Sequence, residues 1–171
     1  LNEAVHWAVL SAFSNAGQRC ASGSRIIVME NIYQLFKKKF LSKTLSLKLG
    51  VGNDCDLGPL INKKSFASVL EILSNIKKSD GKILCGGHAS NNKSHKNGYY
   101  ILPTIVECSN LNADFNCKEI FAPVTSLIKV KNVSEALRIA NTSEYGLTSS
   151  IHTKNLDTAM WFATRVRSGL A

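Results

Sequence analysis

The chain has 171 residues, of which 44% are hydrophobic and 19% are charged, a balance typical of a globular domain rather than a disordered segment. No run of 18 apolar residues occurs, so no membrane-spanning helix is expected. The net charge of +9 makes nucleic acid one partner class to weigh.

The first part of the chain alternates helical and extended patterns. Apolar side chains recur at helical spacing over residues 2–14, and the β-branched run at residues 26–28 is typical of a buried strand. A second helix is predicted over residues 31–45. Residues 47–62 contain three glycines and a proline and show no period, which predicts a loop.

The middle of the chain begins with a strongly amphipathic pattern over residues 62–78, which predicts a third helix. Asp80 and Gly81 then predict a turn into a short strand at residues 82–87. Residues 88–97 are polar and basic, which indicates a loop.

The second half again mixes extended and helical patterns. Residues 99–107 are extended in pattern, but Pro103 cannot donate to a sheet ladder and therefore limits them to an edge or irregular strand. Strands and helices are predicted to alternate beyond this point, at residues 124–130, 134–141, 146–153 and 156–168. Asn132 or Ser134 is placed to cap the first of these helices and Asn155 the second.

This alternation predicts the fold class. Strands that alternate with helices form mainly parallel sheets covered by helices, so the chain is expected to be an α/β protein. The sequence shows no internal repeat and no low-complexity tract, so we expect one compact unit over residues 1–171.

The basic residues favour lysine, with 16 lysines against 5 arginines, whereas base readout and stacking favour the planar guanidinium. The run Lys37 to Lys39 lies in the second predicted helix and is expected on its solvated face. The apolar stripe of this helix is predicted to contain Ile32, Leu35, Phe36, Phe40 and Leu41. No RRM, KH or zinc-finger pattern is present, so a basic nucleic-acid-binding module is the weaker alternative.

The five cysteines are odd in number and lack CxxC pairs, which argues against a zinc site or a disulfide framework and predicts no bound metal. A reducing compartment fits best, so the protein is expected in the cytoplasm. Cys20 differs from the others because it follows Gly17, Gln18 and Arg19 where a helical pattern stops. A helix end beside a cation is a setting that produces a thiol nucleophile. Packing or surface roles are expected for the other four thiols, Cys55, Cys85, Cys108 and Cys117.

Three stretches need a joint explanation: NAGQRCASGSR at 15–25, KEIFAPV at 118–124, and YGLTSSIHTKNLDTAMWFATRVRSG at 145–169. Their order and spacing closely resemble the catalytic domain of the NAD(P)-dependent aldehyde dehydrogenase superfamily. In that superfamily a GQxC motif, an E-I/L-F-G/A-P motif and a YGL segment follow one another. The lesser segments GPLIN, ILCGG and GYYILPTI also occur in the family's order. The resemblance covers essentially the whole chain and implies a three-layer αβα catalytic domain.

The resemblance implies a role for three residues. The Cys20 thiolate would attack an aldehyde carbon to give a thiohemiacetal and, after hydride transfer to the cofactor, a thioester that water hydrolyses to the acid. The backbone N–H of Cys20 would stabilise the oxyanion. Glu119 would accept hydrogen bonds from the nicotinamide ribose, and Phe121 would pack near the nicotinamide. The implied cofactor is NAD or NADP, with NAD favoured.

The substrate implied by the resemblance is a small-molecule aldehyde, and Gln18, Arg19 and Ala21 are the substrate-pocket candidates. The family's general base lies well before the nucleophile, whereas only 19 residues precede Cys20. We therefore expect the base, the cofactor-binding domain and a C-terminal oligomerisation segment to be absent from residues 1–171, which alone should be inactive. The full-length protein is expected to be a homodimer or homotetramer. A non-catalytic scaffold with the same fold is a further alternative.

Three other features are interpreted as structural. Arg25 is expected to anchor the fold through a salt bridge, and His152 to be a hydrogen-bonded histidine within a strand. The apolar cluster Met160 to Phe162 is expected to belong to the core.

Overall fold

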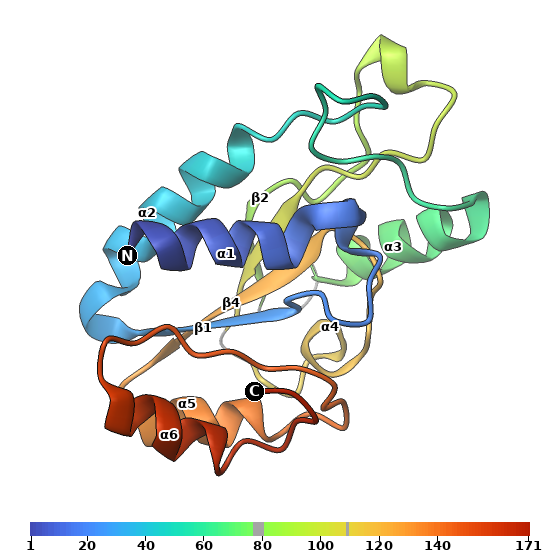
Figure 1. The fold of residues 1–171 in the computed structure, drawn as a ribbon. Helices are drawn as coiled ribbons and strands as arrows, with labels where there is room; N and C mark the ends of the chain where they lie inside the picture. The colour runs from blue at the N-terminus through green and yellow to red at the C-terminus, as the bar shows by residue number, and fades with distance from the viewer. Residues whose placement is uncertain (77–80, 109) are drawn as a thin grey trace.

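A computed structural model describes residues 1–76, 81–108 and 110–171 (Figure 1). Four strands form one sheet, in the spatial order β1 (Arg25–Met29), β4 (Val124–Val130), β3 (Thr104–Glu107) and β2 (Lys82–Cys85). The strands β1, β4 and β3 run parallel, and β2 is antiparallel to β3. The sheet is therefore mixed and mostly parallel, which confirms the predicted α/β class.

Helices cover both faces of this sheet. The helices α1 (Asn2–Phe13) and α2 (Glu30–Leu45) enclose one core with the sheet, and α3 (Lys63–Ile76) and α5 (Val133–Ala140) enclose another. This arrangement has the three layers that the family resemblance implied. None of the helices in the described part of the chain is long and apolar enough to cross a membrane.

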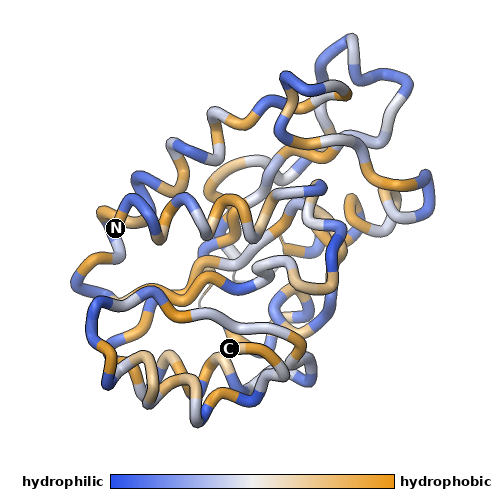
Figure 2. Tube along the Cα trace, viewed as in Figure 1, coloured by the Kyte–Doolittle hydropathy of each residue, from blue (hydrophilic) through white to orange (hydrophobic). Residues whose placement is uncertain are grey.

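The period-two alternation of strand side chains divides the core between the two faces. Ile105 and Leu127 contact the α1 and α2 side, whereas Val106 and Ile128 contact the α3 and α5 side. Figure 2 shows the strands as mostly hydrophobic and the segment around the short 3-10 turn η2 (Lys93–His95) as mostly hydrophilic. Burial between two helix layers explains the apolar run of residues 26–29 in β1.

The edge position predicted from Pro103 is wrong, because β3 lies inside the sheet between β4 and β2. The predicted irregularity is confirmed: residues before Pro103 form only an isolated bridge between Ile101 and Ala89, and the pairing of β3 with β2 contains a register shift. The strand begins at Thr104, directly after the proline, and the Thr104 N–H donates to the Pro123 carbonyl at 2.8 Å. The ladder with β4 therefore starts at the first residue after the proline, which has an N–H to donate.

Residues 146–153 do not form the predicted strand. Their pairing is confined to the end of the chain, with a bridge between Thr148 and Leu170 and a hydrogen bond from the Ser149 N–H to the Leu170 carbonyl at 2.9 Å. Gly169 and Leu170 also donate to the carbonyls of Gly146 and Leu147, but these contacts amount to an isolated bridge and not to a ladder. His152 is accordingly exposed and outside any strand, so the interpretation of a strand histidine is wrong.

Both N-caps in the second half are confirmed. The Asn132 side chain accepts from the Glu135 N–H at the start of α5, and the Asn155 side chain accepts from the Thr158 N–H at the start of α6 (Leu156–Ala163). The helix α6 ends earlier than predicted, where the Thr164 hydroxyl donates to the Met160 carbonyl at 2.9 Å.

The expected core cluster at the end of α6 is only partly buried. Phe162 is buried, whereas Met160 is 56% exposed. The other expected helices, including α2 and α3, lie close to their predicted bounds. Residues 47–62 form the predicted loop. The predicted helix end at residues 77–78 and the predicted turn at Asp80 lie outside the described residues.

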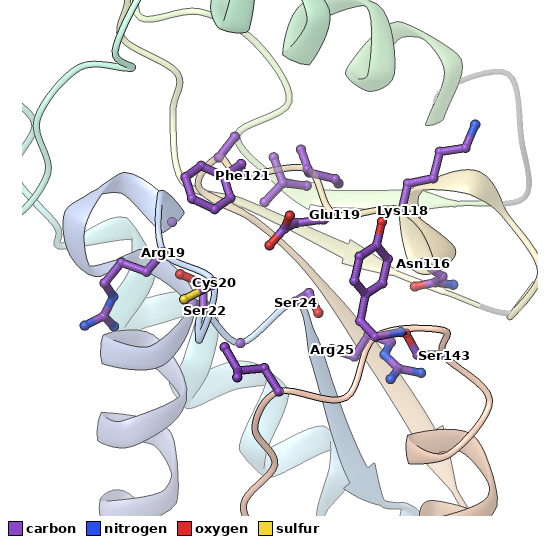
Figure 3. Close-up of a pocket in the computed structure, with 18 of the residues that line it drawn as sticks. Arg19, Cys20, Ser22, Ser24, Arg25, Asn116, Lys118, Glu119, Phe121 and Ser143 are labelled. Atoms are coloured by element: carbon purple, nitrogen blue, oxygen red, sulfur yellow. The ribbon is translucent and has the colours of Figure 1, made fainter. Parts of the chain in front are cut away.

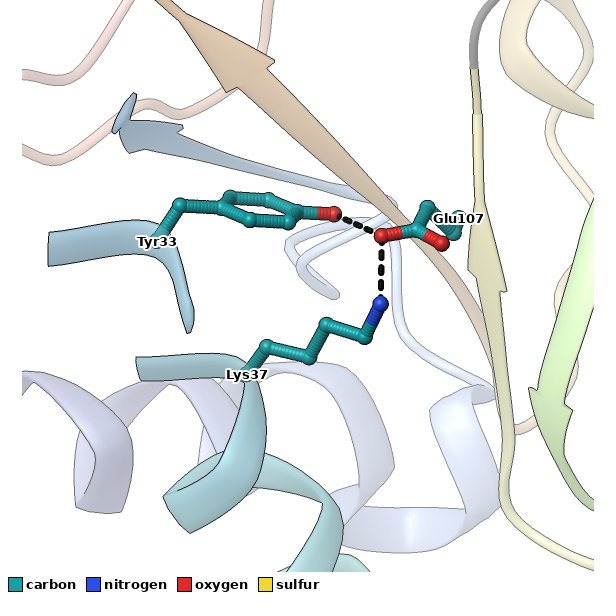
Figure 4. Close-up of polar contacts among 3 residues, drawn as sticks. All are labelled: Tyr33, Lys37 and Glu107. Atoms are coloured by element: carbon teal, nitrogen blue, oxygen red, sulfur yellow. Dashed lines mark hydrogen bonds and ion pairs between the residues drawn. The ribbon is translucent and has the colours of Figure 1, made fainter. Parts of the chain in front are cut away.

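The buried face of α2 differs from the predicted stripe, because Ile32 and Leu35 are 41% and 53% exposed. Tyr33, Phe36, Phe40 and Thr44 are the buried residues. This rotation brings Tyr33 and Lys37 to the carboxylate of Glu107 at the end of β3, as Figure 4 shows. Lys37 is therefore half-buried in an ion pair, and only Lys38 and Lys39 of the lysine run are fully exposed.

Candidate active site

Cys20 is exposed in a turn that follows α1 and the 3-10 segment η1 (Ser14–Gly17). Within η1, Asn15, Ala16 and Gly17 have φ angles of 53°, 54° and 68°. Three successive residues in the left-handed region are unusual, and such backbone strain clusters at functional sites. The conformation of this turn is therefore set by contacts around it rather than by local preference.

Hydrogen bonds close the turn from within. The Asn15 side chain donates to the Gln18 carbonyl at 3.1 Å, and the Gln18 N–H donates to the Asn15 carbonyl at 3.1 Å. The Gln18 side chain also contacts the Asn15 carbonyl, 3.3 Å from its Nε2, and extends from the turn to another loop. Its Oε1 accepts from the Ile61 N–H at 2.9 Å and its Nε2 lies 3.3 Å from the Pro59 carbonyl.

The turn packs directly against the segment that carries the second motif. A Cβ placed on Gly17 would lie 2.1 Å from the Ala122 carbonyl oxygen. Ala16 and Ala122 are also buried, so water does not separate the two segments. Only a glycine permits this approach, which brings the Cys20 turn and residues 119–123 together.

Residues 119–123 connect the short helix α4 (Asp114–Cys117) to β4. Phe121 has a φ of 57° and is 45% exposed, although a large aromatic residue rarely adopts the left-handed region. Glu119 is exposed as well. An exposed ring beside an exposed carboxylate offers both stacking and hydrogen-bonding surface to a ligand.

These segments enclose a cavity of about 250 Å³. Cys20 and Arg19 line it from the turn, and Glu119 and Phe121 line it from the second motif (Figure 3). Residues 145–148, from the third motif, also line it. The fold thus brings together all three stretches that the sequence singled out.

The three residues predicted to line a substrate pocket, Gln18, Arg19 and Ala21, do not all line this cavity. Gln18 and Ala21 are not among the described residues that line this cavity. Arg19 lines it, but Figure 3 shows its guanidinium directed away from Glu119. Their role toward a substrate stays a prediction.

Arg25 anchors the fold, but not through the predicted salt bridge. Its Nη1 and Nη2 donate to the carbonyls of Ile139 at 2.9 Å and Ala140 at 3.1 Å, at the C-terminal end of α5. Carbonyls at a helix end lack partners within the helix and attract cations. Burial lowers the pKa of Arg25, and its side chain also lines the cavity.

Asn116 was missed by the sequence analysis. It is 7% exposed and lines the cavity, and its Nδ2 donates to the Cys108 Sγ at 2.6 Å and the Asn110 carbonyl at 2.9 Å. Its Oδ1 has no partner among the described residues. The helix that carries it is only four residues long, too short for a periodic signal.

The five thiols differ in exposure. Cys20 and Cys117 are exposed, whereas burial raises the pKa of the Cys85 and Cys108 thiols. Cys55 is half-buried, and all five are free. Across the described ranges, no three His, Cys, Asp or Glu side chains meet where a metal ion could bind.

Comparison with known proteins gives one family. The model of the aldehyde dehydrogenase family matches residues 1–171. The chain is 34% identical to alpha-ketoglutaric semialdehyde dehydrogenase of Bacillus subtilis, over 99% of this chain and 35% of that protein. It is 36% identical to D-glyceraldehyde dehydrogenase (NADP(+)) of Thermoplasma acidophilum, over 99% of this chain and 34% of that protein.

Solved structures of aldehyde dehydrogenases share the fold of this chain. Betaine aldehyde dehydrogenase from Staphylococcus aureus in complex with NAD+ superposes with a TM-score of 0.94 at 26% identity, over 97% of this chain and 33% of that one. The E194S mutant of aldehyde dehydrogenase from Bacillus cereus gives a TM-score of 0.92 at 28% identity, over 98% of this chain and 34% of that one. The chain spans about a third of the length of these relatives.

Proposed function

The chain belongs to the aldehyde dehydrogenase family, and from this premise we propose that it carries the nucleophile and part of the cofactor site of an enzyme that oxidises an aldehyde to a carboxylic acid with NAD(P). One observation carries the proposal: Cys20 lines the same cavity as Glu119 and Phe121, which lie about a hundred residues further along the sequence. The exposure of the Cys20 thiol is what a nucleophile requires.

In the proposed reaction, the Cys20 thiolate adds to the aldehyde carbon. A carbon–sulfur bond forms, and the carbonyl π electrons move to the oxygen, where the backbone N–H of Cys20 is proposed to stabilise them. A nicotinamide cofactor, when bound, supplies the acceptor for the hydride, which leaves a thioester on the sulfur. Water then adds to the thioester carbon, the acid departs, and the Cys20 thiol is regenerated.

Residues of this chain fit the nicotinamide end of such a cofactor. The exposed Glu119 carboxylate offers two oxygens, enough to accept from both hydroxyls of a ribose, and the exposed Phe121 offers an apolar surface for a ring. The cavity of about 250 Å³ is near the lower end of ordinary ligand pockets, roughly 300 Å³. We propose NAD as the cofactor, with NADP as the alternative, because relatives are named with each.

The rest of the machinery is proposed to lie outside residues 1–171. Support comes from the coverage, since the chain spans about a third of its relatives. We propose that the general base and the rest of the cofactor site come from other segments. Residues 1–171 alone would then turn over no aldehyde, and the full-length protein would act in the cytoplasm as a homodimer or homotetramer.

The natural full-length protein tests this function. Wild type, Glu119→Gln and Glu71→Gln are assayed with a panel of aldehydes and NAD+ or NADP+, and formation of the reduced cofactor is followed. Glu71 is an exposed carboxylate on α3 and serves as the matched control. We expect wild-type and Glu71→Gln turnover, and a roughly tenfold to hundredfold lower kcat/KM for the cofactor in Glu119→Gln, the cost of losing charged hydrogen bonds. Absence of any reduced cofactor with wild type would overturn the proposal.

A further inference from the structure

We propose that Gln18 is a positioning residue for Cys20, holding the nucleophile's turn to the loop at residues 57–62. The inference rests on the proposed function, because it assigns Gln18 a role through the Cys20 thiol. In this role the Gln18 side chain contacts backbone atoms of the protein, whereas the sequence predicted that it contacts the substrate.

The Gln18 amide uses both its acceptor and its donor. Its Oε1 accepts from the Ile61 N–H at 2.9 Å, and its Nε2 lies 3.3 Å from both the Pro59 carbonyl and the Asn15 carbonyl. A carboxylate could serve only the Ile61 N–H, and an apolar side chain could serve none of the three. The position therefore requires a group that both donates and accepts.

The loop that receives Gln18 is itself fixed to the body of the protein. Leu60, between the two partners of Gln18, is buried, and its N–H donates to the Tyr99 carbonyl at 2.9 Å. Gln18 thus connects the cysteine turn to an anchored segment about forty residues away in the sequence.

The turn needs such a connection because its backbone is strained. Asn15 and Ala16 are in the left-handed region, which side chains disfavour, most clearly at Ala16. Gln18 follows them directly and lies two residues before Cys20. If the side-chain bonds of Gln18 were lost, relaxation of the backbone would move Cys20 relative to Glu119 across the cavity.

The geometry gives little support to a direct substrate contact. All the hydrogen bonds of the Gln18 amide are directed to backbone atoms, and Gln18 does not line the cavity among the described residues. A substrate that used this amide would have to break a bond that holds the turn.

The test uses the natural full-length protein as wild type, Gln18→Ala, Gln18→Glu and Gln34→Ala. Gln34 is the other glutamine of the chain and is exposed on α2, so it is the matched control. Three quantities are measured: the rate of Cys20 alkylation by iodoacetamide, read by peptide mass spectrometry; kcat and KM for aldehyde and cofactor; and the midpoint of thermal unfolding.

We expect Gln18→Ala to slow Cys20 alkylation and kcat by about tenfold to hundredfold, because small misplacements of a reacting group have effects of that size. Both KM values should change by less than about threefold, and Gln34→Ala should match wild type. Gln18→Glu keeps the acceptor for Ile61 and should fall between wild type and Gln18→Ala. If Gln18→Ala does not fold, Gln18→Met, which keeps the side-chain volume without the amide, replaces it.

Unchanged alkylation and kcat in a folded Gln18→Ala protein would overturn the inference. A raised KM for the aldehyde with unchanged alkylation would also overturn it, in favour of a substrate contact. Failure of the proposed function looks different, because the wild-type protein itself would then form no reduced cofactor.

Discussion

Gly17 lies so close to Ala122 that a Cβ on Gly17 would stand 2.1 Å from the Ala122 carbonyl oxygen. This contact joins the turn that carries Cys20 to the segment that carries Glu119 and Phe121. The φ of 68° at Gly17 adds a second reason for glycine, because side chains disfavour the left-handed region.

Gly17→Ala should therefore disrupt the site and the fold together. The new Cβ would push backbone against backbone, and we expect a loss of about 2–5 kcal/mol in unfolding free energy from overpacking and φ strain combined. Urea unfolding checks the stability, and Cys20 alkylation checks the site. Gly58→Ala is the control, since a Cβ at Gly58 meets nothing within 4 Å. Equal stability of the two variants would refute the role of the contact.

Glu107 joins β3 to α2 through two partners. Its Oε1 lies 2.6 Å from the Lys37 Nζ and 2.7 Å from the Tyr33 hydroxyl. Burial acts to raise the pKa of Glu107, but the hydrogen bonds from Lys37 and Tyr33, together with the positive charges of Lys37 and Lys82, leave the pKa below its ordinary value. Burial and the bond to Glu107 raise the pKa of Tyr33, which keeps its hydroxyl a donor.

The lowered pKa of Glu107 gives a pH dependence with a definite sign. Its stabilisation should be fully present above the pKa of the unfolded chain, about 4.3, and should be lost as the pH falls through the lower folded value. We expect Glu107→Gln to lower the unfolding free energy by about 1–3 kcal/mol at pH 7 and by less at pH 3. Urea unfolding of wild type and Glu107→Gln at both pH values measures this loss of unfolding free energy. Glu71→Gln, at an exposed carboxylate, is the control. A deficit that is equal at both pH values would contradict the assignment.

Arg25→Lys should weaken the attachment of α5 to β1. A lysine carries one ammonium group and cannot reproduce the forked contact with the carbonyls of Ile139 and Ala140. We expect a loss of about 1–3 kcal/mol in unfolding free energy, measured by urea denaturation. Arg138→Lys, at an exposed arginine of α5, should change it by less than about 0.5 kcal/mol. Indistinguishable curves for the two variants would show that the fork adds no stability.

Local patterns were enough to predict most elements of the fold. Except for the strand expected at residues 146–153, the strand–helix order was found as predicted, and so were the caps at Asn132 and Asn155, because these features depend on neighbouring residues. The place of β3 depends on which strands it meets, and no pattern within residues 99–107 contains that information. In α2 the prediction was right for Phe36 and Phe40 and wrong for Ile32 and Leu35. The inward position of Lys37 depends on Glu107, a residue 70 positions away, which no local pattern contains.

In the candidate site, too, local motifs predicted which residues matter, whereas tertiary contacts could not be predicted. Cys20, Glu119 and Phe121 were singled out by motif, and the structure brings them to one cavity. The bonds from Gln18 to the loop at residues 59–61 and the burial of Asn116 depend on tertiary packing. A sequence pattern can mark Gln18 as part of a motif without showing which atoms it binds.

Covalent chemistry at Cys20 is decided by mixing the natural full-length protein with an aldehyde and NAD+ and recording both NADH formation and intact mass. Cys55→Ala, at a half-buried thiol outside the cavity lining, is the control for Cys20→Ala. We expect wild type and Cys55→Ala to form NADH and to carry an acyl group on Cys20, and Cys20→Ala to lose at least about a thousandfold in rate and to carry no adduct. NADH formation by Cys20→Ala at the wild-type rate would contradict the account.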